Sequence, residues 1–269
     1  PVTVVAGDNR LYAVKKNKLK KICAADAAIN CTHGLNGEDG TLAGVMRLSK
    51  IALASPSLFP SSLSMDKYYT KIALKGIGVE TLPYVKLGRR NYIGKRALAS
   101  KVVTGKLGFP VIVKPANLGS SIGIKVAKNE AELYDALDDA FRYDDKVIVE
   151  KALTGFREIN CACIKLGEKY LVSECEEPKL CGDILSFTDK YSGEKKTDFP
   201  ANISKKISDE IKSVTSYIYR KLEFRGAVRI DFLLSGEKVY VNEINSVPGS
   251  LAYYLFSDSI KDFCSLLIE

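Results

Sequence analysis

The chain has 269 residues, of which 46% are apolar and 27% charged, and its formal net charge is +8. This length suffices for a sizeable core, and this balance is typical of a folded protein rather than a disordered one. No apolar run approaches the roughly 18 residues that a membrane helix needs, and no signal peptide opens the sequence. Composition therefore indicates a globular protein and no membrane partner.

Cysteine usage and charge distribution narrow the class further. The seven cysteines are odd in number and form no CxxC pair, which argues against a disulfide framework and a zinc ribbon. Because thiols persist in reducing compartments, we expect a cytoplasmic protein. The basic residues are scattered, without a basic tail or a basic stripe interleaved with aromatics. That favours a solvated surface over nucleic-acid binding, and it also fits a site for a phosphorylated small molecule.

The first 64 residues alternate short apolar runs with polar turns, which is typical of an α/β domain. Val2–Val5 and Ala28–Cys31 are predicted strands, with a turn and a short extended piece between them. His33–Gly40 contains three glycines and leads into an apolar-periodic stretch, as in a strand–loop–helix unit. Since the chain begins at Pro1 and enters a strand at once, we expect the start of this domain to be missing.

A second domain is predicted over residues 65–154. Its first helix has Ser64 as a plausible N-cap and Asp66 in the first turn, where a negative charge suits the helix dipole. A later helix capped by Asn129 has one apolar face, formed by Leu133, Ala136, Leu137, Ala140 and Phe141. The predicted strands are Phe109–Lys114, Ile122–Val126 and Val147–Glu150.

A third domain is predicted over residues 155–269. Strands are expected at Arg157–Ile164 and Tyr170–Glu174, and an amphipathic helix over 204–222. Residues 180–200 hold few apolar side chains and are predicted to form a long functional loop. Two closing strands, Arg229–Leu234 and Val239–Asn245, precede a final helix that begins near Ser257.

The closing pair of strands carries the sharpest chemical pattern. Period-two alternation places Arg229 and Asp231 on one face of the first strand, and Glu243 and Asn245 on one face of the second. A three-residue loop, Gly236 to Lys238, would set Asp231 opposite Glu243. Two carboxylates so close repel unless a cation lies between them, and such a set suits Mg²⁺. The alternative is a surface salt-bridge face.

Two further segments are candidates for nucleotide binding. After a strand, Lys114 precedes a small-residue loop with Gly119, Ser120, Ser121 and Gly123, whose backbone N–H groups suit an anion. A β-hairpin turn with a surface lysine fits this segment equally well. The apolar strand that ends over residues 150–153 offers backbone groups to a flat base, although an ordinary strand and turn explains it better without context.

In order and spacing, these segments resemble the D-alanine–D-alanine ligase family of the ATP-grasp group over nearly the whole chain. The resemblance rests on Met65-Asp66-Lys67, Val113-Lys114-Pro115 with Gly119–Gly123, Arg157-Glu158, Asp189-Lys190-Tyr191, Arg229–Phe232, and Asn242–Asn245 with Pro248-Gly249. His33-Gly34 and Gly37–Gly40 are similar to the family's N-terminal signature. The resemblance implies an α/β (α+β) ATP-grasp fold with an incomplete N-terminal α/β domain.

The resemblance also implies a role for each matching residue. ATP phosphates would contact Lys67, Lys114 and Ser121, with Lys190 near the γ-phosphate, while the adenine would lie against Glu150, Lys151, Ala152 and Leu153 and the ribose against Glu158. Two Mg²⁺ ions, or Mn²⁺, would bind Asp231, Glu243 and Asn245. Arg229 and the Gly249 backbone N–H would stabilise an oxyanion, and Ser120 and Tyr191 would lie in loops that close over substrate. His33, Ser250 and Tyr254 would line the amino-acid pockets.

The implied reaction joins two D-alanines through an acyl phosphate, for peptidoglycan precursors, in a cytoplasmic homodimer. Two departures leave alternatives open. The glutamate-bearing loop that opens the family's sequence is absent, which favours a non-catalytic nucleotide-binding relative. Tyr254 stands where the family usually has serine, so D-lactate or D-serine remains an alternative acceptor.

Overall fold

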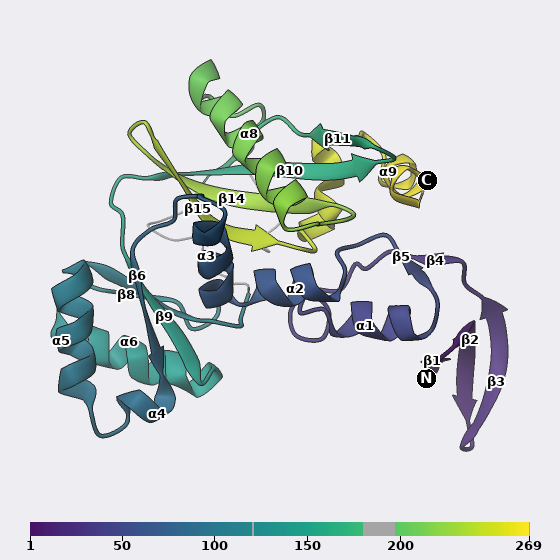
Figure 1. The fold of residues 1–269 in the computed structure, drawn as a ribbon, viewed down its shortest axis with the longest axis horizontal. Helices are drawn as coiled ribbons and strands as arrows, with labels where there is room; N and C mark the ends of the chain where they lie inside the picture. The colour runs from purple at the N-terminus through teal and green to yellow at the C-terminus, as the bar shows by residue number, and fades with distance from the viewer. Residues whose placement is uncertain (120, 180–196, 269) are drawn as a thin grey trace.

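The computed structural model describes residues 1–119, 121–179 and 197–268. Two four-stranded antiparallel sheets dominate it, each backed by helices, and a smaller N-terminal part lies beside them (Figure 1). In the described residues no helix is long and apolar enough to cross a membrane.

The central sheet has the strand order β6 (Tyr84–Gly88), β9 (Lys146–Lys151), β7 (Val111–Pro115) and β8 (Lys125–Ala127). On one face, α5 (Arg96–Leu107) and α6 (Glu130–Tyr143) cover odd-numbered valines such as Val111 and Val149. The predicted inward residues of α6 are all buried, and Asn129 accepts a hydrogen bond from the Glu132 N–H, so both predictions are confirmed. The even-numbered side chains, Lys114 and Glu150 among them, therefore take the opposite face.

The second sheet has the order β11 (Lys169–Val172), β10 (Arg157–Leu166), β14 (Val228–Ser235) and β15 (Lys238–Asn245). Its apolar face packs against α8 (Lys205–Lys221) through residues such as Ile159, Ile230 and Phe232. Glu158 of β10 and Asp231 of β14 lie on the opposite face of this sheet. Beyond β15 follow the turn η1 (Gly249–Leu255) and α9 (Ile260–Ile268), and two short strands, β12 (Glu177–Pro178) and β13 (Thr197–Asp198), pair beside β10.

The N-terminal part differs most from its prediction. Strand β1 (Val2–Val5) is confirmed, but it opens an unforeseen antiparallel meander with β2 (Asp8–Lys15) and β3 (Lys18–Ala24). The predicted strand at Ala28–Cys31 is wrong beyond its first residue, since β4 covers only Ala27–Ala28 and pairs with β5 (Ala52–Leu53). Two helices, α1 (Thr41–Leu48) and α2 (Leu58–Met65), complete this part.

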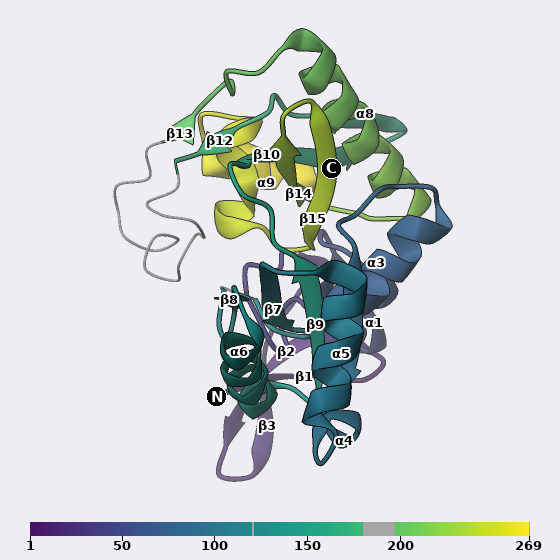
Figure 2. The ribbon, with the colours of Figure 1, turned by 90° about the vertical axis from the view of Figure 1, so that its left-hand side faces the viewer.

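Helix α3 (Lys67–Gly76) links the parts of the molecule (Figure 2). Asp66, not Ser64, is its N-cap and accepts hydrogen bonds from the Tyr68 and Tyr69 N–H groups, because Ser64 belongs to the preceding α2. Leu74 of α3 packs in the core of the C-terminal sheet. The short α4 (Arg89–Tyr92) follows β6. The domain boundaries at 65 and 155 stay a prediction.

We expect Asp66→Ala to lower the free energy of unfolding by about 1–3 kcal/mol, because it removes both the cap of α3 and an ion pair with Lys146. Urea denaturation measures this. Asp66→Asn is the matched control, since asparagine caps helices as well but lacks the charge. An Asp66→Ala protein of unchanged stability would contradict the capping role.

Candidate active site

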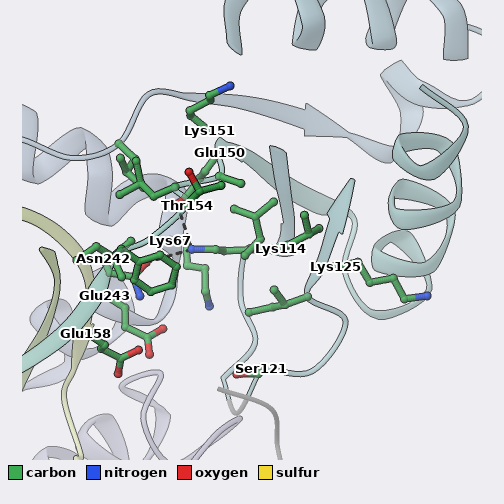
Figure 3. A pocket seen from close by; sticks show the side chains of 18 of the residues that line it. Lys67, Lys114, Ser121, Lys125, Glu150, Lys151, Thr154, Glu158, Asn242 and Glu243 are labelled. Carbon is green, nitrogen blue, oxygen red and sulfur yellow. Dashed lines mark hydrogen bonds and ion pairs between the residues drawn. The ribbon is translucent and has the colours of Figure 1, made fainter. Parts of the chain in front are cut away.

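A cavity of about 790 Å³ lies between the inner faces of the two sheets (Figure 3). Nine residues predicted from the sequence line it: Lys67, Lys114, Ser121, Glu150, Lys151, Ala152, Leu153, Glu158 and Glu243. They come from α3, β7, β9 and its end, β10, β15 and the loop after β7. The structure thus brings together segments that are separated by up to 176 positions in the chain (Lys67 and Glu243).

One end of the cavity is apolar. Side chains from both sheets and their connections form it, namely Leu82, Ile112, Val126, Leu153, Phe156 and Leu233. Two facing apolar surfaces with polar backbone nearby suit a flat heteroaromatic ring. Of these residues, only Leu153 is predicted from the sequence to belong to the site. Lys151 contributes little charge here, because its Nζ donates to the Phe109 carbonyl at 2.9 Å and points away from the centre in Figure 3.

Lys114 is held at the centre of the site by two acceptors. Its Nζ donates to Glu150 Oε2 at 3.0 Å and to Asn242 Oδ1 at 3.1 Å. Glu150 is buried, with 1% of its side chain exposed, and its other oxygen, Oε1, lies 3.4 Å from Lys71 Nζ. Burial opposes the charge on Glu150, but the two lysines outweigh it and hold the pKa of its carboxyl below the usual range. A fixed ammonium thus faces the cavity.

Lys67 occupies the first turn of α3, beside Lys114. Its backbone N–H donates to the Ala116 carbonyl at 3.0 Å, which ties the start of the helix to the end of β7. Its Nζ donates to the Leu118 carbonyl. Two lysines from different elements therefore line the same cavity, an arrangement suited to a polyphosphate.

The closing hairpin has the predicted pairing but not the predicted loop. Asp231 lies opposite Glu243 and Arg229 opposite Asn245, whereas Ser235 pairs with Lys238, so the loop has two residues. The register shifts between Asp231 and Phe232, where Asn242 is the extra residue of a β-bulge. The bulge places both Asn242 and Glu243 at the cavity. The sequence predicts no site role for Asn242, because no residue pattern here indicates the bulge that brings it to the cavity.

Asp231, which lies opposite Glu243 on the neighbouring strand, is hydrogen-bonded to Arg229 and Asn245. Its Oδ1 accepts from Arg229 Nε at 2.7 Å, and its Oδ2 accepts from Arg229 Nη2 and Asn245 Nδ2, each at 2.9 Å. Burial opposes the charge of Arg229, but Asp231 outweighs it and raises the pKa of the guanidinium above its usual value.

The oxygen donors at this face fit Mg²⁺. Asp231 and Glu243 are directly opposed on neighbouring strands, and Asn245 contacts Asp231. Within residues 1–119, 121–179 and 197–268, no group of three or more His, Cys, Asp or Glu could hold a metal by itself. Two carboxylates and one amide leave coordination positions for water and phosphate oxygens, which is how proteins usually bind Mg²⁺.

His33 lies beside Val247, a residue 214 positions away in the chain that lies just after the end of β15. Its Nδ1 is 3.0 Å from the Val247 carbonyl and 3.9 Å from Glu38 Oε1. Glu38 raises the pKa of the imidazole, partial burial opposes this, and the Val247 carbonyl adds to the rise. The other Glu38 oxygen accepts from the Gly34 N–H at 2.6 Å, so this carboxylate also orders the glycine-rich loop.

The segment after Pro248 forms a left-handed turn. Ser250, Leu251 and Ala252 have φ of 52°, 54° and 52°, which side-chain-bearing residues rarely adopt in succession. Beyond the turn, Tyr254 donates from its hydroxyl to Glu176 Oε1 at 3.0 Å. Burial, and then Glu176, raise the pKa of this phenol. Gly249 and Ser250 are exposed, and neither they nor Tyr254 line the cavity described above.

Three predicted site residues, Ser120, Lys190 and Tyr191, lie outside the described residues, as does most of the loop predicted over 180–200. Their roles stay predictions.

Comparison with known proteins assigns the family. Residues 73–263 match the family model described as D-ala D-ala ligase C-terminus. The chain belongs to the D-alanine–D-alanine ligase family. It is 41% identical over 239 residues to a D-alanine–D-alanine ligase of Helicobacter pylori (strain P12), covering 88% of this chain and 67% of that protein. It is 37% identical to one of Thermosipho africanus (strain TCF52B), covering 99% of this chain and 74% of that protein.

Solved structures of the family confirm the predicted fold. The crystal structure of D-alanine–D-alanine ligase from Helicobacter pylori matches with a TM-score of 0.80 and 35% identity, covering 98% of this chain and 76% of that one. The VanG D-Ala:D-Ser ligase from Enterococcus faecalis matches with a TM-score of 0.80 and 28% identity, covering 96% and 79%. The predicted ATP-grasp fold class is therefore correct. Because these two ligases match with equal TM-scores, fold similarity does not discriminate between their acceptors.

We expect Ser250→Gly to raise the free energy of unfolding by about 0.5–1 kcal/mol, because glycine adopts a positive φ without strain and Ser250 is exposed. Ser250→Ala, which retains Cβ, is the control and should change stability little. Thermal and urea denaturation compare the two. If glycine destabilised the protein more than alanine, the turn would not be strained at this position.

His33 is the single histidine of the chain, so its titration can be followed by NMR without assignment. We expect a pKa above 6.5, and Glu38→Gln should lower it, because burial then dominates. A raised pKa stabilises the fold below pH 6.5, and this contribution is lost as pH rises through the folded-state pKa. Asp39→Asn, in the same loop, is the control. An unchanged pKa in Glu38→Gln would refute the coupling.

Proposed function

We propose that this protein is an ATP-dependent ligase that joins two D-alanines, with release of ADP and phosphate. One observation carries the proposal: Lys67 and Lys114 line the same cavity as Glu243, with Asp231 and Asn245 adjoining it, in a chain whose relatives are named D-alanine–D-alanine ligases. Cationic groups for phosphates next to oxygen donors for a divalent cation are what phosphoryl transfer from ATP requires.

The reaction follows from the weakness of a carboxylate as an acyl donor. The carboxylate of the first D-alanine attacks the γ-phosphorus of ATP, which forms an acyl phosphate and releases ADP. The deprotonated amine of the second D-alanine then attacks the acyl carbon. The nitrogen of the tetrahedral intermediate gives up a proton to the departing phosphate, and the oxyanion collapses. The C–O bond to phosphate breaks, and a D-alanyl-D-alanine amide and inorganic phosphate remain.

The cavity and the predicted site residues outside its lining each receive a role in this scheme. The adenine lies in the apolar end against residues 150–153, with Glu158 at the ribose, while Lys67, Lys114 and Ser121 contact the phosphates. Arg229 and the Gly249 N–H stabilise the oxyanion, and His33, Ser250 and Tyr254 line the amino-acid pockets. Asp231, Glu243 and Asn245 would hold Mg²⁺, which neutralises charge on the phosphates when it is bound. Ser120, Lys190 and Tyr191 keep the closing roles that the family resemblance implies.

The acceptor is proposed to be D-alanine because the relatives of highest identity cited above carry that name. D-Serine is the second candidate, because the D-Ala:D-Ser ligase has an equally similar fold. Tyr254 and Glu176 are hydrogen-bonded to each other, and both interact electrostatically with Arg229. This supports an influence of the pair on the choice of acceptor. We further propose, as the family resemblance implies, a homodimer that supplies peptidoglycan precursors, and a cytoplasmic location, where ATP is available.

The test is phosphate release from ATP with D-alanine, D-serine or D-lactate as the added acceptor. We expect release to depend on D-alanine, and Glu243→Gln to reduce it about 100-fold or more, because an amide is a weaker ligand for a hard cation. Glu237→Gln, in the exposed turn of the same hairpin, is the matched control and should retain activity. Circular dichroism checks that both variants fold.

Full turnover in Glu243→Gln would overturn the metal assignment. Absence of acceptor-dependent phosphate release in the unmodified protein would favour a non-catalytic nucleotide-binding relative. Preference for D-serine or D-lactate would correct the acceptor alone.

A further inference from the structure

Lys71 is a buried lysine that no step of the proposed reaction uses. It lies on α3, four residues after Lys67, and only 3% of its side chain is exposed. Its Nζ lies 3.4 Å from Glu150 Oε1 and 5.6 Å from the centre of the Tyr84 ring. Lys71 does not line the cavity, so it cannot contact a ligand there directly. Lys71 can affect the site through its ion pair with Glu150 and through its charge near Lys114.

The charge of the buried cluster shows what that effect would be. Lys114 and Glu150 alone form a neutral pair, and a neutral pair attracts an anion weakly. Burial lowers the pKa of the Lys71 ammonium, Glu150 opposes this, and Lys114 adds to the lowering. With Lys71 protonated, the three buried groups carry a net charge of +1. Glu150 then divides its two oxygens between the lysines, Oε2 to Lys114 and Oε1 to Lys71. Lys114 remains fixed by its hydrogen bond while the cluster as a whole stays positive at the cavity.

The geometry of the Lys71 contact agrees with a charge role rather than a hydrogen-bonding one. Among the described residues, neither Lys71 Nζ nor Glu150 Oε1 has a hydrogen-bond partner with good geometry, although the two atoms are an ion pair. Burying an ammonium costs several kcal/mol unless opposite charge compensates it. A leucine or methionine would fill the same space without that cost. The charge itself is therefore the feature to explain.

We propose that Lys71 is a positioning residue of the nucleotide site, which balances Glu150 so that Lys114 presents uncompensated positive charge to the phosphates. The inference rests on the proposed function for the identity of the anion. It assigns Lys71 an effect on phosphate binding and none on recognition of the base.

Direct binding measurements with ADP and with adenosine test this, because neither requires ligase activity. We expect Lys71→Met to weaken ADP binding about 10-fold, equivalent to about 1.4 kcal/mol, and to change adenosine binding less than 2-fold. In turnover, KM for ATP should rise more than kcat falls. Lys75→Met, which removes the same charge from an exposed position of α3, is the matched control and should bind ADP normally.

The double variant Lys71→Met/Glu150→Gln separates charge from structure. We expect it to restore the ratio of ADP to adenosine affinity to within about 3-fold of the unmodified protein, since a neutral amide still accepts from Lys114 without cancelling its charge. Lys71→Arg should retain the ratio. If Lys71→Met does not fold, the double variant and Lys71→Arg carry the test.

Equal weakening of ADP and adenosine in Lys71→Met would overturn the proposal and indicate a structural role. Unchanged ADP binding, or failure of the double variant to recover the ratio, would also overturn it. Failure of the unmodified protein to bind ADP at all would instead overturn the proposed function, so the two failures are distinguishable.

Discussion

The alternation of side chains along a strand is the constraint on which this structure depends. In β7, Val111 and Val113 pack against helices, so Ile112 and Lys114 must face the other way. In β14, Ile230 and Phe232 pack against α8, so Arg229 and Asp231 take the opposite face. Helices α5 and α6 cover one face of the central sheet and α8 covers one face of the second, while η1 and α9 pack against Ala162 and Ile164 on part of its other face. The uncovered polar parts of the two sheets meet at one cavity. A one-residue slip in either sheet would move the charges into the core.

Burial gives these charges their effect. The chain carries 40 basic and 32 acidic residues, but most of them lie scattered at the surface, where salt screens them. The Lys114–Glu150 pair is different, because less than a tenth of either side chain is exposed. The free-energy cost of burying these ions is offset by their contact with each other and by their contacts with Asn242 and Lys71, which fix their positions before a ligand arrives. The site is in this sense preorganised for an anion.

Features set by interactions between residues close in sequence could be predicted, whereas features that depend on distant residues could not. The apolar face of α6 and its Asn129 cap follow from local pattern, and both were predicted correctly. The pairing of Asp231 with Glu243 was also correct, although the loop was not. One extra residue in the turn and one extra residue in a bulge shift the register equally, so a count of residues does not distinguish them.

Lys71 and Asn242 were not predictable for a different reason. Lys71 and Lys75 are one turn apart on the same helix and look alike in sequence, yet one is buried and the other exposed. Only the position of Glu150, 79 residues away in the chain, distinguishes them. Asn242 likewise acquires its role from Lys114, which belongs to the other sheet. Long-range partners of this kind leave no local signal.

The two ends of the site differ in the same respect. The part proposed to bind the nucleotide is built mainly on regular strands, whose faces follow from periodicity. The part proposed to bind the amino acids is built from loops, namely the His33 and Glu38 segment and the turn after Pro248, with the Gly119 segment beside them. They converge because Val247 O lies within 3.0 Å of His33 Nδ1, Ser246 donates to the Glu38 carbonyl, and a Cβ on Gly119 would lie 3.9 Å from Glu38 Oε2. Positive φ angles and contacts between distant loops determine this end, and neither follows from hydrophobic pattern. Changes confined to these loops can therefore alter the proposed amino-acid pocket while the strands of the proposed nucleotide site keep their geometry.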